Sequence, residues 1–311
     1  MKIMFMGTPD FAVTSMNALK NAGHDIVGVV TMPDRPKGRG HKMMHTPVFE
    51  AAQSFGAEIF TPESIKEEYF GDTLKSINPD IIIVVAYGKI LPEYILNYPK
   101  YGCVNVHASL LPKYRGAAPI QRSIIDGEKI TGVTTMYMEK GLDTGDMLLK
   151  SEVEILPGDN YESLHDKLAV SGAELIVKTV DLLEKGECIP EKQDDSQSCY
   201  AHMITKDTAT INWNETADKI HNLIRGLYPV PKAFSFYNSK IMKIGLSRLS
   251  DKHCEKTPGT IVEVTKKSFF VSCKNGSVLE ILSVQMEGKK MMSVSDFLVG
   301  NEIIVNTRLG E

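Results

Sequence analysis

The sequence predicts an α/β fold with a doubly wound, Rossmann-like, mostly parallel sheet, followed by a smaller C-terminal β-barrel domain that is OB-like. Three observations predict it. A chain of 311 residues is about twice the usual domain length of roughly 150. In its first half, short runs rich in Val and Ile alternate with amphipathic stretches, which is typical of a parallel sheet covered on both faces. Near the end, short strands separated by turn residues follow one another.

The helices and strands of the first half are predicted from the periodicity of its hydrophobic residues. The expected helices are the amphipathic stretches 11–23, 48–57 and 161–186, the last of which ends at Gly186. Because crossovers between parallel strands are right-handed, we expect a doubly wound sheet with its functional loops at the carboxyl ends of the strands. The expected strands are 2–7, 25–31, 80–88, 102–109 and 131–138.

The second half has a different organisation. Residues 190–207 are polar and without period, which indicates a linker between a first domain over 1–189 and a second over 208–311. A helix is expected from about residue 214, and it must stop before Pro229. Five short strands are then expected at 233–237, 241–247, 259–265, 268–273 and 277–284.

Composition excludes several classes of protein. With 42% hydrophobic and 24% charged residues, the chain is not disordered, collagenous or coiled-coil. It has no run of about 18 apolar residues and no signal-peptide pattern at its start. The five cysteines are scattered and form no Cys-x-x-Cys pair, which argues against disulfides and zinc. We therefore expect a cytoplasmic protein with no membrane contact and no metal.

Charge is divided unevenly along the chain. Residues 1–205 carry a balance of −8 and residues 206–311 one of +4, which together give the net charge of −4. A basic second part suggests a polyanion partner. The alternative is an ordinary soluble surface, and charge alone favours that alternative.

The turn after the first expected strand reads GTPDFAV (7–13), with Thr8 as the expected N-cap of the first helix. It lacks the glycine patterns that bind dinucleotides or the phosphates of P-loop proteins. The segment 33–47 is a long loop in which Gly and Pro exclude a helix. Its cations suit phosphate binding, although a solvated basic loop is the commoner fate of such a charge run. These cations are Arg35, Lys37, Arg39 and Lys42.

Asn105 and His107 stand two residues apart on an expected strand, so both side chains leave the same face. An amide can donate a hydrogen bond to a developing oxyanion, and an imidazole changes charge near neutral pH. This pair suits acyl transfer, and because no Ser or Cys nucleophile motif accompanies it, we infer direct transfer without a covalent enzyme intermediate. The alternative is a structural Asn–His pair bonded to backbone.

The Gly-bracketed turn EKGLDTGDMLL (139–149) holds Asp143 and Asp146. If the preceding strand delivers this turn beside residues 105–107, one of these carboxylates could orient His107 and favour its imidazolium form. Spacing alone does not choose between the two, and either could be a turn residue.

Four segments then occur in a distinctive order: GTPDFAV, PDRPKGRGHKM, NVHASLLPKYRGAAPIQ and GLDTGDM. The chain resembles the methionyl-tRNA formyltransferases of the folate-dependent formyltransferase family over nearly its whole length. The resemblance implies that Asn105, His107 and Asp143 are the catalytic residues and that Arg39 lies in the loop that meets the tRNA acceptor end. It also implies a folate-binding segment made of Ser109, Leu110, Leu111 and Pro112.

The resemblance implies transfer of a formyl group from the co-substrate 10-formyltetrahydrofolate to the α-amino group of initiator methionyl-tRNA. Asn105 and His107 would stabilise the tetrahedral intermediate, and nothing in the sequence demands a dimer, so we expect a monomer. One alternative is a folate-dependent formyltransferase acting on an amino sugar or a purine precursor. Another is a non-catalytic RNA-binding protein.

Overall fold

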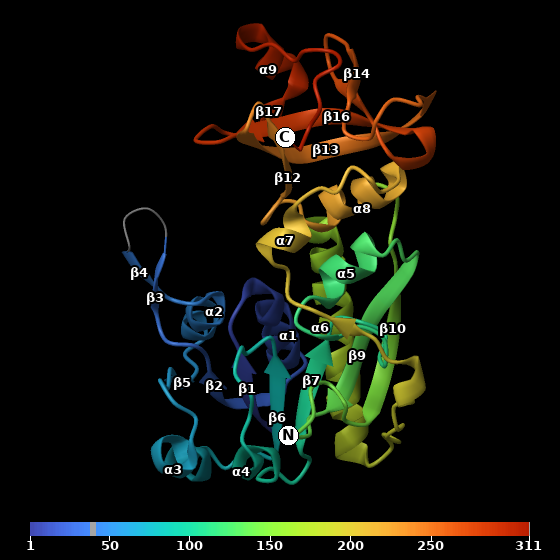
Figure 1. The fold of residues 1–311 in the computed structure, drawn as a ribbon. Coiled ribbons are helices and arrows are strands. Elements are labelled where there is room, and N and C mark those ends of the chain that lie inside the picture. The colour runs from blue at the N-terminus through green and yellow to red at the C-terminus, as the bar shows by residue number, and fades with distance from the viewer. Residues whose placement is uncertain (38–41, 311) are drawn as a thin grey trace. The chain divides into compact units, whose positions relative to one another are not determined.

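The computed structural model describes residues 1–37 and 42–310, which form two compact units (Figure 1). The first unit comprises residues 1–116, 130–154 and 165–201. The second comprises residues 117–129, 155–164 and 202–311. Residues 117–129 and 155–164 therefore pack with the C-terminal part of the chain, although they lie early in the sequence.

Seven strands in the described part of the first unit form one sheet, in the order β10-β9-β7-β6-β1-β2-β5. The five strands from β7 to β5 pair in parallel, whereas β9 is antiparallel to β7 and β10 is antiparallel to β9. The predicted mostly parallel sheet is confirmed, with an antiparallel pair at one side. The strands are β1 (Lys2–Gly7), β2 (Asp25–Val30), β5 (Ile59–Phe60), β6 (Ile81–Val85), β7 (Cys103–His107), β9 (Ile130–Tyr137) and β10 (Met147–Glu154).

Helices connect these strands, and the central strand β6 is buried along its whole length, as expected for a strand covered on both faces. The hydroxyl of Thr8 donates a hydrogen bond to the carbonyl oxygen of Tyr87 at 2.8 Å, and Pro9 is the N-cap of α1. The prediction that Thr8 caps this helix was therefore wrong, because a neighbouring loop takes its hydroxyl. The helices are α1 (Asp10–Asn21), α2 (Pro47–Ser54), α3 (Glu67–Ile77), α4 (Glu93–Leu96) and α6 (Tyr161–Lys185).

The segment predicted as a long basic loop is instead the base of a β-hairpin that projects from the sheet (Figure 1). Its strands β3 (Arg35–Lys37) and β4 (Lys42–Met44) are antiparallel, and Lys37 pairs with Lys42. The prolines that exclude a helix are compatible with a short two-stranded ribbon that belongs to no larger sheet. Arg39 lies outside the described residues.

The second unit contains an antiparallel sheet in the order β12-β13-β16-β15-β14, with β17 paired to β16. All five predicted strands of this region are present, and β13 is longer than expected. The separate antiparallel-sheet domain of the predicted fold class is thus confirmed. The strands are β12 (Ala233–Tyr237), β13 (Lys240–His253), β14 (Ile261–Val264), β15 (Phe269–Ser272), β16 (Ser277–Met286) and β17 (Met292–Ser293).

Helices of the second unit pack on one another and on this sheet. α8 confirms the helix expected from about residue 214, and α5 packs against it. The indole N–H of Trp213 donates to the hydroxyl of Ser235 at 2.9 Å inside the apolar core. The elements not yet given are α5 (Pro119–Ile125), α7 (Lys206–Ala209), α8 (Ala217–Gly226), α9 (Val294–Gly300), the 3₁₀ turn Lys274–Gly276, and the first unit's β8 (Arg115–Gly116), β11 (Tyr200–Ala201) and 3₁₀ turn Asp195–Gln197.

Gly132 in β9 is predicted to tolerate no side chain. A Cβ there would overlap the carbonyl oxygen of Ser151 and would come within 2.6 Å of Leu110 Cδ2. Gly132→Ala should destabilise the protein by roughly 1–3 kcal/mol, because one extra carbon in a filled space forces backbone shifts. Thermal unfolding should show a lowered midpoint, whereas Gly158→Ala, a site with nothing within 4 Å of the added carbon, should leave it in place. Equal midpoints for the two variants would contradict this reading of the packing.

Candidate active site

Strand β7 carries Asn105 and His107 at its carboxyl end, where it pairs with β6 on one side and with β9 on the other. The intervening Val106 is buried against α6, where a Cβ on Gly172 would lie 3.0 Å from its methyl group. Since side chains alternate along a strand, Asn105 and His107 leave the opposite face. Asn105 and His107 therefore share one face of the sheet, as predicted, because Val106 packs on α6 on the other face.

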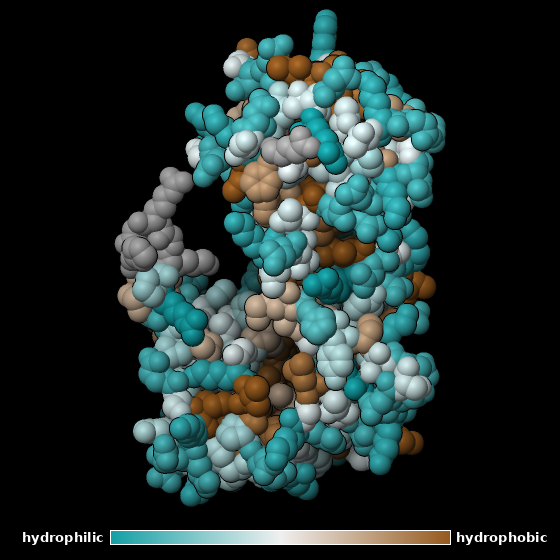
Figure 2. Space-filling model, in the orientation of Figure 1, coloured by the Kyte–Doolittle hydropathy of each residue, from teal (hydrophilic) through white to brown (hydrophobic). Residues whose placement is uncertain are grey.

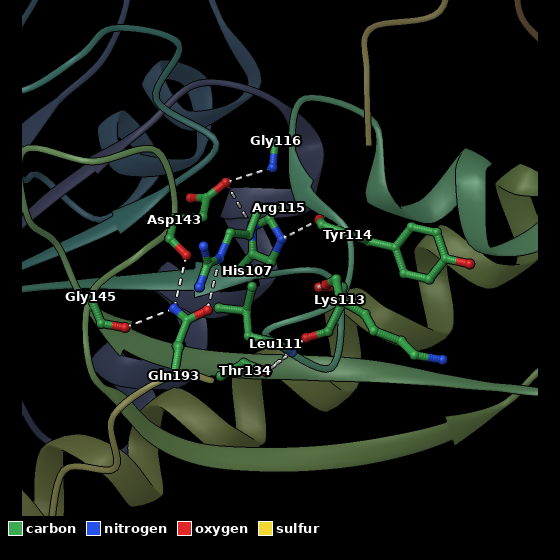
Figure 3. Close-up of polar contacts among 11 residues, drawn as sticks. His107, Leu111, Lys113, Tyr114, Arg115, Gly116, Thr134, Asp143, Gly145 and Gln193 are labelled. Carbon is green, nitrogen blue, oxygen red and sulfur yellow. Dashed lines mark hydrogen bonds and ion pairs between the residues drawn. The ribbon is translucent and has the colours of Figure 1, made fainter. Parts of the chain in front are cut away.

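The imidazole of His107 is held between two oxygen atoms (Figure 3). Its Nε2 lies 2.9 Å from the carbonyl oxygen of Tyr114, and because a carbonyl only accepts, Nε2 donates this hydrogen bond. Its Nδ1 lies 3.7 Å from Oδ2 of Asp143, and the ring is only 6% exposed. The structure thus brings Asp143 to His107, a choice between two carboxylates that the sequence left open. The backbone of Asp146, in contrast, accepts a hydrogen bond from the N–H of Tyr137.

Asp143 lies in a tightly fixed loop between β9 and β10. Its φ of 52° is in the left-handed region, and its Oδ2 accepts a hydrogen bond from the N–H of Gly116 at 2.8 Å. The carbonyl oxygens of Asp143 and Gly145 both accept from the side-chain amide of Gln193, each at 2.8 Å. A Cβ on Gly145 would overlap the carbonyl oxygen of Tyr137, so this loop requires glycine there. Both the carboxylate and the backbone of Asp143 are consequently fixed by neighbours.

Asn105 differs from His107 in its environment. It is half-buried, and within the described residues its side-chain amide makes no hydrogen bond. An amide with open hydrogen-bonding capacity beside a buried imidazole can serve an incoming polar group. The alternative of a structural Asn–His pair bonded to backbone therefore describes His107 but does not describe Asn105.

Residues Ser109 to Pro112 form a turn directly after β7. The hydroxyl of Ser109 donates to the carbonyl oxygen of Lys113 at 2.6 Å, and the backbone N–H of Leu111 donates to the hydroxyl of Thr134 at 3.1 Å. The Thr134 hydroxyl in turn donates to the carbonyl oxygen of Ser109 at 2.7 Å. These groups are used within the turn, and Leu110 and Pro112 keep partial exposure while Ser109 and Leu111 are buried. The folate-binding role of this segment stays a prediction.

The segment 187–201, which we call the connector, overlaps the polar linker that the sequence predicts over 190–207. In the structure it packs on the site through Gln193, Asp195 and Cys199. Arg115 is 3% exposed, and its guanidinium donates to Gln193 Oε1 at 2.9 Å and to Asp195 Oδ1 at 2.7 Å. The sequence does not reveal these residues, because polar side chains without hydrophobic periodicity carry no pattern that predicts which side chains they contact.

A pocket of about 420 Å³ opens at the carboxyl ends of β1 and β6. The chain turns from β1 toward β2 and β5 and later resumes at β6 on the other side of β1, so the strand order reverses there. Such a reversal is where open α/β sheets bind ligands. In Figure 2, apolar side chains drawn in brown gather on the viewed face of the first unit. The pocket is lined by Thr8, Pro9, Met32, Pro33, Arg35, Pro36, Met44, His45, Thr46, Pro47, Ala86, Tyr87 and Gly88.

Burial controls two titratable groups near these strands. It raises the pKa of the Tyr87 phenol to about 12, with a further contribution from Tyr94. It also raises the pKa of the Cys103 thiol, at the start of β7, to about 12. Cys103 is therefore a neutral thiol at physiological pH, which agrees with transfer that forms no thioester on this residue.

Two comparisons of sequence decide the family. The formyl transferase family model matches residues 1–180, and the model of the formyl transferase C-terminal domain matches residues 203–302. The chain belongs to the formyl transferase family. It is 48% identical over 311 residues to a methionyl-tRNA formyltransferase from Alkaliphilus oremlandii, covering 100% of both chains. It is 48% identical over 310 residues to a protein of the same name from Caldanaerobacter subterraneus, covering 99% of this chain and 100% of the other.

Solved structures share the fold at low identity. An N-formyltransferase from Helicobacter canadensis, in complex with folinic acid and dTDP-3-aminofucose, matches with a TM-score of 0.66 and 19% identity. That match covers 92% of this chain and 99% of the other. HypX from Aquifex aeolicus, in complex with tetrahydrofolic acid, matches with a TM-score of 0.62 and 12% identity over 98% of this chain and 50% of that chain. At these identities the similarity supports the fold of this family and no more.

The predicted basic residues are only partly placed. Arg35 is exposed and lines the pocket at the base of the hairpin, and Lys37 and Lys42 belong to its paired strands. Among residues 1–37 and 42–310, no cluster of three His, Cys, Asp or Glu side chains could hold a metal ion. In the same described ranges, no helix is both long and apolar enough to cross a membrane.

The raised pKa of Cys103 predicts a low reactivity toward alkylating reagents. Because the thiolate reacts and its population falls tenfold per pKa unit, native Cys103 should alkylate at pH 8 about a thousandfold more slowly than in the unfolded chain. Mass spectrometry after timed iodoacetamide treatment measures this, with the exposed Cys199 as the internal positive control. Native labelling of Cys103 as fast as that of Cys199 would contradict the prediction.

Proposed function

We propose that this chain transfers the formyl group of 10-formyltetrahydrofolate to the α-amino group of methionine esterified to initiator tRNA. The observation that carries this proposal is the 48% identity over the full chain to proteins named methionyl-tRNA formyltransferase. The arrangement of Asn105, His107 and Asp143 supports a mechanism for it.

The reaction balances without a covalent enzyme intermediate. The neutral amine attacks the formyl carbon, a C–N bond forms, and a tetrahedral oxyanion develops. Collapse of the oxyanion breaks the bond to the folate nitrogen, which takes up a proton while the attacking amine loses one. The side-chain amide of Asn105 donates a hydrogen bond to the oxyanion. Asp143 orients His107 and passes the amine proton to water.

His107 also donates to the oxyanion in this mechanism. Its Nε2 bonds to Tyr114 in the structure, so this donation requires the ring or the Tyr114 carbonyl to shift when substrates bind. Hydrogen bonds of catalytic groups commonly rearrange between the free and substrate-bound enzyme. The contact to Asp143 through Nδ1 would be kept during such a shift.

The folate co-substrate supplies the activated formyl group. Ser109, Leu110, Leu111 and Pro112 form its binding segment in this proposal, with the partly exposed Leu110 and Pro112 contacting it. The half-buried amide of Asn105 lies on β7, the strand that leads into this turn, and it suits a formyl group bound beside the turn. The turn is already closed by its own hydrogen bonds, so binding costs little ordering of its backbone.

The tRNA contacts are divided between parts of the chain. Arg35, Lys37, Arg39 and Lys42 bind phosphates at the acceptor end, and the pocket at the hairpin base receives the aminoacylated terminus, where Met32 and Met44 suit an apolar side chain. The domain over 1–189 performs the chemistry, the domain over 208–311 binds the tRNA body, and 190–207 joins them. The enzyme acts as a monomer in the cytoplasm.

Removal of the Asn105 amide should slow catalysis. Asn105→Ala should lower the single-turnover rate about a hundredfold or more, because a single oxyanion donor is worth roughly 3–4 kcal/mol. Rapid-quench measurement with labelled 10-formyltetrahydrofolate and methionyl-tRNA gives this rate. Asn17→Ala, on the exposed side of α1, is the control and should react normally. A near-normal rate for Asn105→Ala would remove the amide from the mechanism.

The basic segment 33–47 should act on the tRNA and not on folate. Arg39→Ala and Arg35→Ala should raise KM for methionyl-tRNA more than KM for 10-formyltetrahydrofolate, and the affinity for tRNA should fall steeply with salt. Initial rates at several salt concentrations measure both. The same assay with a free amino sugar in place of tRNA tests the other class of formyltransferase. Equal increases in KM for both substrates would contradict this role of the basic segment.

A further inference from the structure

The connector reaches both residues that contact the His107 ring. Its Gln193 bonds to the backbone of Asp143, and the Sγ and carbonyl oxygen of its Cys199 accept hydrogen bonds from the backbone N–H groups of Tyr114 and Arg115, at 3.2 Å and 2.9 Å. Tyr200 pairs in parallel with Arg115 through the short strands β11 and β8. A segment far along the chain therefore fixes both oxygen partners of the imidazole.

Both the nitrogen and the oxygen of the Gln193 amide make hydrogen bonds. Its Nε2 donates to two carbonyl oxygens, those of Asp143 and Gly145, while its Oε1 accepts from Arg115 Nε (Figure 3). Only a side chain of this length that carries two N–H donors and an acceptor satisfies all three partners. Glutamate offers no donor, and methionine offers neither donor nor strong acceptor. The orientation of the amide is thus set by the chemistry of its neighbours.

Arg115 fixes Gln193 from the other side. Its side chain is buried, and its charge is balanced by Asp195, which is 83% exposed on the outer surface of the connector. A buried guanidinium must have acceptors for its N–H groups, so Arg115 requires Gln193 Oε1 in place. The chain of contacts runs from Asp195 through Arg115 and Gln193 to the backbone of Asp143.

We propose that Gln193 is a positioning residue that sets the backbone of Asp143 so that its carboxylate faces Nδ1 of His107. Asp143 has a left-handed φ of 52°, a conformation that a non-glycine residue keeps only when its surroundings determine it. The two hydrogen bonds from Gln193 hold the backbone at the carbonyl of this residue and at that of Gly145, two residues later. This inference rests on the proposed function of Asn105, His107 and Asp143.

Gln193→Glu tests the proposal because it keeps size and removes both donors. The single-turnover rate of formyl transfer should fall about tenfold to a hundredfold, as expected for a small displacement of a catalytic group. KM for each substrate should stay within about threefold, because no substrate contact is assigned to Gln193. Gln197→Glu is the matched control: the same change on the same segment, at an exposed residue whose side chain donates to Asp194 Oδ2. It should react normally.

The double variant with Asp143→Ala separates positioning from general support of the structure. If Gln193 acts through Asp143, adding Gln193→Glu to Asp143→Ala should slow the reaction by less than a further threefold. Multiplying effects would overturn the proposal, since Gln193 would then act elsewhere. The proposal would also be overturned if Gln193→Glu and Gln193→Met both react within threefold of the parent rate while Asp143→Ala is slow. The proposed function would survive that result.

Folding and the proposed function are checked in parallel. Thermal unfolding of each variant identifies a loss of structure, and Gln193→Met avoids the repulsion that a new carboxylate introduces. If neither Gln193 variant folds, the residue is structural and the proposal is wrong. If Asp143→Ala and Asn105→Ala both react normally, the proposed catalytic site itself is wrong and the positioning role fails with it.

Discussion

The site depends on the fixation of one imidazole between the carbonyl oxygen of Tyr114 and the carboxylate of Asp143. His107 is buried, and a buried polar ring that lacked these partners would cost the free energy of its lost hydration. Each partner is itself fixed by backbone contacts: Tyr114 through its N–H to Cys199, and Asp143 through Gly116 and Gln193. The geometry at the end of β7 is thus determined from three separate stretches of chain.

The antiparallel pairing of β9 with β7 decides which acid reaches His107. In this register His107 pairs with Thr134, and β9 runs on past Asn105 and Val104 before the chain turns. The loop must therefore fold back along the sheet to return a carboxylate to the carboxyl end of β7. Gly145, which packs against the carbonyl oxygen of Tyr137, permits this return, and the left-handed φ of Asp143 completes it. Asp146 lies past the turn, where its backbone re-enters the pairing with Tyr137.

Hydrophobic periodicity and local chemistry predicted five of the seven strands of the first sheet (β1, β2, β6, β7 and β9), the five longer strands of the second sheet, and the shared face of Asn105 and His107, because alternation along a strand is a local property. The two strands at the edges of the first sheet, β5 and β10, were not predicted. Three further features could not be predicted. The direction of β9 depends on the pairing partner, the hairpin at Arg35 has strands of three residues that carry too little pattern, and the contacts of Gln193 join residues 50 and 78 positions apart. The family resemblance implied Asp143, and the structure places Oδ2 of this residue 3.7 Å from Nδ1 of His107, while its catalytic role stays a prediction.

These long-range contacts have a consequence for how the site forms. Gly116 and Asp143 are 27 positions apart, Gln193 and Asp143 are 50, and Arg115 and Asp195 are 80. Closing loops of these lengths costs chain entropy that no single hydrogen bond recovers, so these contacts depend on the sheet and α6 to hold their ends together. The arrangement around His107 is therefore a property of the whole first unit. A connector that is largely polar can take part in it because the energy of folding comes from the apolar strands, while its own hydrogen bonds select the geometry.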